Sequence, residues 1–333
     1  MLQINFNNSY SIIENSFKKI QVRSIFMDKI QRQFYELQFE LYFYKERGNG
    51  FEDFFSKVMK LKFKHNFTEV KTWGNLGDLK CDGYLSDDET IFQVYAPNEI
   101  TGTKLLAKTK EDYQKAIVHW NGCIKHWILV QNSKDGVRGI EANTLQAFEK
   151  YKRDPGNPIK ISIWGIDEIK EIVFSLPIQD LCTLFGTAPT VSDLQNLQIK
   201  HIQPFLTPFR IMVNLPTNDQ DLKEVSQNKI IVNNLSDFIQ DLLKIGMRKA
   251  HLIELIIEQG QDVDAIQNMS ESFRAKYIEL KSEYSSSDQI FYELRDFAGI
   301  KYIQNTTDEL ALLTILAYLF ENCTIFENEI VNV

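Results

Sequence analysis

The chain has 333 residues and a mass of 38.8 kDa, which is long for one domain and suitable for two. Hydrophobic residues make up 44% and charged residues 25%, which excludes a disordered, collagen-like or coiled-coil protein. Residues 1–165 carry 24 Lys and Arg against 20 Asp and Glu, a net charge of +4, whereas residues 166–333 carry 13 against 25, a net charge of −12. Because only the first half is basic, two surfaces with different partners are the simplest explanation of the total of −8.

The sequence also predicts the compartment. The longest apolar run near the C-terminus, residues 310–320, has about half the length that a membrane-spanning helix needs. The polar N-terminus lacks the apolar core of a secretory signal. The four cysteines lie far apart and form no CxxC pair. We therefore expect a cytoplasmic protein with reduced thiols and no membrane segment.

Helical and strand periodicities alternate in the first half. We expect helices over 17–44, 51–63, 103–120, 142–151 and 167–176, and strands over 67–73, 81–85, 90–95, 126–131 and 159–164. The run at 126–131 is apolar throughout, which is typical of a strand covered on both faces. A hairpin followed by helical crossovers predicts a mixed sheet flanked by helices. In the helix at 103–120 the expected inner stripe consists of Leu106, Thr109, Tyr113, Ala116, Ile117 and Trp120.

The second half begins with a proline-containing segment and is helical thereafter. We expect little regular structure near Pro189, Pro204, Pro208 and Pro216. Helices are expected over 235–245, ending at Gly246, and then over 250–259, 263–280, 288–297 and 306–323. The last begins with a capping-box pattern, Thr306 to Glu309, and is apolar enough to form the core. The expected units are a helical segment 1–48, an α/β domain 49–185, a connector 186–230 and a helical domain 231–333.

Several residues of the predicted hairpin carry oxygen ligands. Asp78 and Asp82 lie at the start of its first strand, in the string GDLKCDG, and Gln93 and Tyr95 share one face of its second strand. Glu52, on the preceding helix, could supply another oxygen. Carboxylate and amide oxygens are the ligands that Mg²⁺ prefers, so this pattern favours a site for a hard cation.

The same residues resemble a known superfamily. An acidic residue on the first helix, GDxxxDG and a following QxK-like position resemble the Mrr-like branch of the PD-(D/E)xK nucleases, which have a restriction-endonuclease-like fold. The longer strings GNLGDLKCDGY…FQVYAPNE, FGTAPTVSDL and CTIFENE resemble the effector-type subunits of bacterial ABC-three-component anti-phage defence systems. The resemblance covers most of residues 45–333 and implies an α/β (α+β) fold followed by an all-α C-terminal domain.

The resemblance implies a role for each candidate residue. Asp82 matches the metal-binding aspartate, with Asp78 as a rival, and Gln93 matches the first residue of the (D/E/Q)xK pair. Glu52 is the candidate helix acid. Tyr95 stands where the family has the catalytic lysine, which orients or deprotonates the attacking water. A phenol supplies no positive charge at neutral pH, so Tyr95 is a departure from the pattern.

A lysine from the next helix could replace the missing one. The candidates are Lys104, Lys108 and Lys110. Lys108 aligns best with the lysine of related effector subunits, whereas Lys110 lies at the edge of the expected inner stripe. The sequence leaves the choice between Lys108 and Lys110 open.

The function implied by the resemblance is a DNA endonuclease that uses Mg²⁺ or Mn²⁺. It would cleave phosphodiester bonds in double-stranded DNA as the effector subunit of a defence complex, once partner subunits activate it. The implied partners are an SMC/Rad50-like ABC ATPase and a small middle-component subunit, and formation of a homo-oligomer is left open. The chain has no P-loop lysine, so any ATP hydrolysis would belong to a partner.

Two other functions remain open at this point. A catalytically inactive nuclease-fold subunit that binds DNA or acts as a scaffold is favoured by Tyr95. A pure protein-interaction subunit is the third hypothesis. Each candidate residue also has a structural explanation, because Asp beside Gly is common in turns, Glu52 suits the start of a helix, and lysines often form a solvated helix face.

Overall fold

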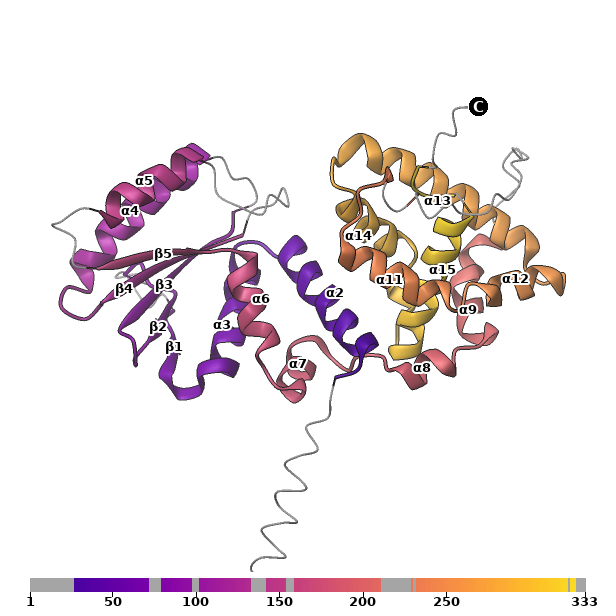
Figure 1. Ribbon diagram of the computed structural model, residues 1–333, viewed down its shortest axis with the longest axis horizontal. Coiled ribbons are helices and arrows are strands. Elements are labelled where there is room, and N and C mark those ends of the chain that lie inside the picture. Colours follow the sequence, from indigo (N-terminus) through magenta and orange to yellow (C-terminus); the bar gives the residue numbers. More distant parts are fainter. Residues whose placement is uncertain are drawn as a thin grey trace, which may run out of the picture.

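The computed structural model describes residues 27–71, 79–97, 102–132, 142–153, 159–210, 229, 232–322 and 324–327. It contains an α/β part, built around a sheet, and a helical part, with helix α2 between them (Figure 1). This architecture confirms the predicted fold class of a mixed sheet flanked by helices and followed by a helical C-terminal region. No helix within the described ranges has the length and apolar composition needed to cross a membrane.

The sheet of the α/β part has five strands in the order β1-β2-β3-β4-β5. Their bounds are Phe67–Glu69, Gly83–Leu85, Thr90–Tyr95, His126–Gln131 and Lys160–Trp164. The first three strands pair antiparallel, and β3, β4 and β5 pair parallel. Parallel neighbours need a long crossover. Helix α4 (Gly102–His119) makes this connection between β3 and β4, and α5 (Ala142–Lys152) makes it between β4 and β5.

Helices cover both faces of this sheet (Figure 1). Helices α4 and α5 lie on one face, whereas α3 (Asn49–Phe63) and α6 (Ile166–Phe174) lie on the other, with α7 (Ile178–Phe185) following α6. Strand β4 contributes Trp127 and Leu129 to the core under α4, and Ile128 and Val130 to the opposite core. All four side chains are buried, so the apolar run is a strand covered on both faces, as predicted.

The helical part is built around its last helix. Its helices are α8 (Val191–Gln195), α9 (Ile199–Leu206), α11 (Asp237–Met247), α12 (His251–Glu258), α13 (Val263–Glu283), α14 (Ser287–Phe297) and α15 (Thr306–Glu321). Short 3₁₀ helices occur at Lys64–Asn66, Thr207–Phe209 and Ile300–Tyr302. From Leu310 to Phe320 every residue of α15 except Leu313 is buried. The expectation that this helix forms core is confirmed.

Helices α11 and α15 differ from the prediction at the residues that were expected to end or cap them. Helix α11 does not end at Gly246 but contains it. A Cβ atom at this position would overlap the backbone of Leu313 on α15. The glycine therefore permits close approach of two helices. The cap of α15 is Asn305 with Asp308, one residue before the predicted capping box, and Asn305 accepts hydrogen bonds from the N–H groups of Thr307 and Asp308.

The expectation of little regular structure after residue 186 is wrong for residues 191–210. Helices α8 and α9 and a 3₁₀ turn lie there, and Leu194, Ile202 and Phe205 belong to the core of the helical part. Two of the prolines suit this arrangement, because Pro189 precedes the cap of α8 and Pro208 stands in the first turn of the 3₁₀ helix. Pro204 stands inside α9, near its C-terminal end. Pro216 lies outside the described residues.

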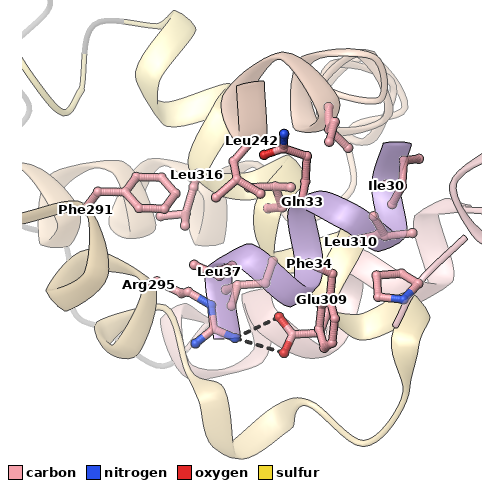
Figure 2. A pocket seen from close by; sticks show the side chains of 14 residues that line it. Ile30, Gln33, Phe34, Leu37, Leu242, Phe291, Arg295, Glu309, Leu310 and Leu316 are labelled. Carbon is pink, nitrogen blue, oxygen red and sulfur yellow. Dashed lines mark hydrogen bonds and ion pairs between the residues drawn. The ribbon is translucent and has the colours of Figure 1, made fainter. Parts of the chain in front are cut away.

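Helix α2 (Lys29–Lys45) joins the two parts. Ile30 and Leu37 belong to the core of the helical part, whereas Phe34 and Phe39 belong to the core of the α/β part. A small, mostly apolar cavity of about 30 Å³ lies between α2 and helices α11, α14 and α15 (Figure 2). Over its described residues, the predicted N-terminal helical segment therefore connects the two cores.

Candidate active site

The hairpin places Asp82 opposite the middle of β3. Asp82 directly precedes β2, and its N–H donates to the C=O of Phe92 (2.9 Å), while its C=O accepts from the N–H of Val70 (3.0 Å). Through these two hydrogen bonds Asp82 continues the pairing of β2 with β3 on one side and with the chain that follows β1 on the other. The next residue is Gly83, where a Cβ atom would lie 2.5 Å from the ring of Phe67, so the glycine allows the two strands to pair at this point.

Asp82 and Gln93 are in direct contact. The Asp82 Oδ2 atom accepts hydrogen bonds from Nε2 of Gln93 (2.6 Å) and from the backbone N–H of Val94 (2.5 Å). Both side chains are nearly inaccessible, because Asp82 is 5% exposed and Gln93 is 6% exposed. The Oε1 atom of Gln93 is buried, and no donor among the described residues reaches it. A buried acceptor without a donor is uncommon in proteins, and this oxygen is available to a further partner.

The oxygens of Asp82 and Gln93 could supply some of the ligands of a hard cation, but not a complete set. The Asp82 carboxylate and the unpaired Oε1 of Gln93 are the kinds of ligand that Mg²⁺ prefers, with water and phosphate oxygens at the remaining positions. Within the described ranges, no group of three or more His, Cys, Asp or Glu side chains is arranged to hold a metal ion. Asp78, the other predicted ligand from the hairpin, lies outside the described residues.

Glu52 lies in a neighbouring ion-pair cluster. Lys71 lies two residues after the end of β1. Its Nζ atom is 3.5 Å from Oε1 of Glu52, 3.0 Å from Oδ1 of Asp53 and 2.8 Å from Oε1 of Glu69. Hydrogen bonds to Glu69 and Asp53 raise the pKa of Lys71. Glu52 thus forms an ion pair with Lys71. Among the predicted ligands, Asp82 and Gln93 are in direct contact with each other.

Tyr95 supplies no positive charge at the position where the nucleases that the hairpin resembles have lysine. It lies on the same face of β3 as Gln93 and is partly buried. Burial and the negative charge of Asp112 raise the pKa of the Tyr95 phenol above its usual value of 10.0. The phenol is therefore neutral at physiological pH.

Two lysines from other elements meet at the carboxylate of Asp112. The Nζ atom of Lys108, on α4, lies 2.9 Å from Oδ1 of Asp112, and the Nζ atom of Lys80, in the loop before β2, lies 3.1 Å from the same oxygen. Asp112 is fully buried. Its second oxygen, Oδ2, has no hydrogen-bond partner among the described residues.

The inner stripe of helix α4 is confirmed at Thr109, Tyr113 and Ala116, but it is rotated relative to the prediction. The buried residues on it include Leu105, Thr109, Asp112, Tyr113 and Ala116. Leu106 and Ile117 are only partly buried, Lys110 is exposed, and Lys108 flanks the buried stripe. The prediction that Lys110 lies at the edge of the inner stripe is therefore wrong, because the helix is rotated toward Leu105. Nothing is described of the Lys104 side chain.

Sequence analysis did not single out Asp112 or Lys80. The spacing of Asp112 could have indicated that it is buried, because it lies at helical intervals from Leu105 and Ala116, within an apolar stripe. Lys80 lies inside the hairpin motif itself, but the direction of its side chain depends on a left-handed backbone at Leu79 (φ 53°) and Lys80 (φ 61°). No residue type in the motif predicts that conformation.

Comparison with known proteins identifies the C-terminal part of the chain. Residues 211–327, about a third of the sequence, match the family model of C-terminal domain 10 of the ABC-three component (ABC-3C) systems. The described portion of this range contains helices α11 to α15. Neither the comparison with curated proteins nor the comparison with solved structures gives a match. This part of the chain is therefore similar to the C-terminal domain of an ABC-three component system, and the match supports a component of such a defence system.

Proposed function

We propose that the chain is the effector subunit of its defence complex and a metal-dependent DNA endonuclease. The observation that carries this proposal is the contact between Asp82 and Gln93 at the junction of β2 and β3, beside an amide oxygen that is buried and unpaired. The order of the elements supports it too. Helix α3, the three antiparallel strands and the crossover helix α4 follow one another as the resemblance to restriction-endonuclease-like nucleases leads us to expect.

The chain's own residues have distinct tasks in this proposal. Asp82 and Gln93 would hold Mg²⁺ or Mn²⁺ through a carboxylate and an amide oxygen. When bound, such a cation supplies positive charge at the phosphate and makes a bound water more acidic. The N–H of Val94 orients the Asp82 carboxylate. Lys108, at the flank of α4, would orient the attacking water and offset charge on the phosphate.

The two parts of the chain would serve different partners. The basic first half would bind double-stranded DNA at the edge of the sheet that carries Asp82. The acidic helical part, which contains the matched C-terminal domain, would dock onto an SMC/Rad50-like ABC ATPase and a small middle-component subunit. Activation would then depend on those partners.

Cleavage of plasmid and linear duplex DNA with Mg²⁺ or Mn²⁺ tests the proposal. The wild type should cleave in the presence of its partner subunits, and Asp82→Asn should abolish cleavage. Asp88→Asn is the matched control, because Asp88 is an exposed carboxylate on the same hairpin. Equal loss in both variants, or full activity of Asp82→Asn, would exclude a catalytic role for the buried pair.

A catalytically inactive DNA-binding or scaffolding subunit is the second candidate. The neutral Tyr95 at the lysine position favours it. Thermal unfolding with added Mg²⁺ or Mn²⁺ separates the two candidates, because a bound ion stabilises the folded state. A rise in the melting temperature that Asp82→Asn removes would support the nuclease. DNA binding without cleavage in any combination of partners, and without a metal-induced rise, would support the inactive subunit.

A further inference from the structure

The last turn of α2 is bound to the helical part through its side chains. Tyr44 donates a hydrogen bond from its hydroxyl to Oε1 of Glu293 on α14 (3.3 Å), and Lys45 forms an ion pair with Asp296 on the same helix. The ring of Tyr44 also lies against the ring of Tyr292, with 5.6 Å between ring centroids. Helix α14 lies in the segment that matches the C-terminal domain. The turn is therefore attached to the part of the chain that we propose as the docking site of partner subunits.

The carbonyl groups at the end of the same turn are bound from the sheet. Asn132, which directly follows β4, donates from Nδ2 to the C=O of Phe43 (2.8 Å) and to the C=O of Glu46 (3.1 Å). Nη1 of Arg47 donates to the same two carbonyl groups. Asn132 is 0% exposed, so its bonds to α2 are shielded from water. A carbonyl group at a helix end has no partner within the helix, and here the sheet supplies one.

Asn132 also contacts the strand that carries the candidate site. Its backbone N–H donates to the C=O of Tyr95 (3.2 Å), the last residue of β3, and the N–H of Gly48 donates to the C=O of Ala96 (2.7 Å). Val94, which precedes Tyr95, donates the hydrogen bond that orients the candidate metal-binding carboxylate. A shift of α2 relative to the sheet would therefore move the end of β3.

The two sides of α2 differ in how well they are packed. Toward the α/β part its rings lie against those of α3, with 4.9 Å between the centroids of Tyr42 and Phe54 and 5.1 Å between those of Phe43 and Phe51. Toward the helical part lies the cavity of about 30 Å³ shown in Figure 2. Gln33 lines this cavity, and its buried Oε1 atom has no hydrogen-bond partner in the described part of the chain. A close-packed contact transmits strain, whereas a contact with a void loses part of its attraction, so we expect the contact with the helical part to change first.

We propose that the last turn of α2 couples the helical part to the candidate site, so that docking of a partner on the helical part changes the alignment of β3. The contacts with α14 follow the position of the helical part, and Asn132 transmits a change in that position to β3. Asn132 is a positioning residue, since it acts through the strand and not on a substrate. The inference deepens the proposed function, because it names how partner subunits control the site, and it rests on that function for the role of those partners.

Amide hydrogen exchange of the full chain in EDTA, followed by mass spectrometry, tests the coupling without metal or DNA. Glu293→Ala combined with Asp296→Ala removes the polar contacts of α14 with α2. Exchange of the Gly48 and Asn132 N–H groups should become about fivefold faster, as the loss of one ion pair and one hydrogen bond predicts.

The matched control for this variant lies on α13. Glu279→Ala combined with Glu283→Ala removes two exposed carboxylates from the helical part and should leave exchange at Gly48 and Asn132 unchanged. Unchanged exchange in the α14 variant as well would overturn the proposal. Equally faster exchange in β1, at the other edge of the sheet, would also overturn it, because the effect would then be a general loss of stability. If the α14 variant fails to fold, Tyr44→Phe, which removes only the hydroxyl, decides between these outcomes.

Cleavage of duplex DNA tests the regulatory role. Tyr44→Phe combined with Lys45→Gln changes α2 and leaves the matched C-terminal domain intact. The ratio of the cleavage rates with and without partner subunits should fall about fivefold in this variant, and an unchanged ratio would refute control through α2. Absence of cleavage in every chain would refute the proposed function instead, and the exchange measurement would then decide the inference by itself.

Discussion

Replacement of Asp82 by alanine should destabilise the α/β part strongly, independently of any metal. The Asp82 carboxylate accepts hydrogen bonds from the backbone N–H of Val94 and from Nε2 of Gln93 in a nearly inaccessible position. Alanine would leave both donors buried without an acceptor. Each unsatisfied buried donor costs about 1 to 3 kcal/mol, so we expect the free energy of unfolding to fall by about 3 kcal/mol.

Asparagine provides the informative comparison at the same position. Its side-chain oxygen can still accept from Val94, so Asp82→Asn should lose only about 1 kcal/mol. Asp88→Ala, at an exposed site, should stay within about 0.5 kcal/mol of the wild type. The assay is equilibrium unfolding in urea with EDTA, followed by circular dichroism. If Asp82→Ala were as stable as Asp88→Ala, the carboxylate would not hold the two strands together, and our description of the site would be refuted.

Three further predictions concern other parts of the molecule. Glu309→Gln should lower the free energy of unfolding by about 3 kcal/mol, because Arg295, whose side chain is 6% exposed, loses the carboxylate that it binds at 2.8 Å through both oxygens; a change below about 1 kcal/mol in urea unfolding would contradict this. Gly246→Ala should destabilise the chain by about 2 kcal/mol although alanine favours helices, since its Cβ would overlap the backbone of α15; a more stable variant would show that α11 can move away. Burial and the charge of Lys160 lower the pKa of His126 from 6.5 to about 4, so the unfolded chain binds a proton that the folded chain does not, and stability should fall as the pH decreases from 6.5 to 4. His126→Gln should remove this part of the pH dependence, and an NMR titration that gives His126 an ordinary pKa would contradict its cause.

The class of fold was predictable because it depends on local periodicity. The short runs of strand-forming residues at 90–95 and 126–131 predict strands without any knowledge of their neighbours. The contact between Asp82 and Gln93 could also be predicted from the sequence, because a short hairpin fixes the register of its two strands and places these residues opposite each other. The assignment of a metal or of catalysis to that pair remains a proposal.

Other features depended on contacts between distant segments. Helices α8 and α9 were missed because the prolines of this segment suggested a connector. Packing of Leu194, Ile202 and Phe205 into the helical core stabilises the two helices. The double role of α2 also depends on partners far along the chain, since aromatic and aliphatic residues alternate on it without indicating two cores.

The rotation of α4 decides the chemistry at the sheet edge. Leu105 and Leu106 are equally apolar, so periodicity alone does not distinguish a stripe through Leu106 from one through Leu105. Packing on β3 and β4 selects Leu105, and this choice buries Asp112 and leaves Lys110 in solvent. The sequence by itself thus determined the hairpin and the residues that it brings together, Asp82 and Gln93. The charged side chains around the hairpin were decided by the packing of α4 and of the loop before β2 against the sheet, because tertiary contacts set the direction of those side chains.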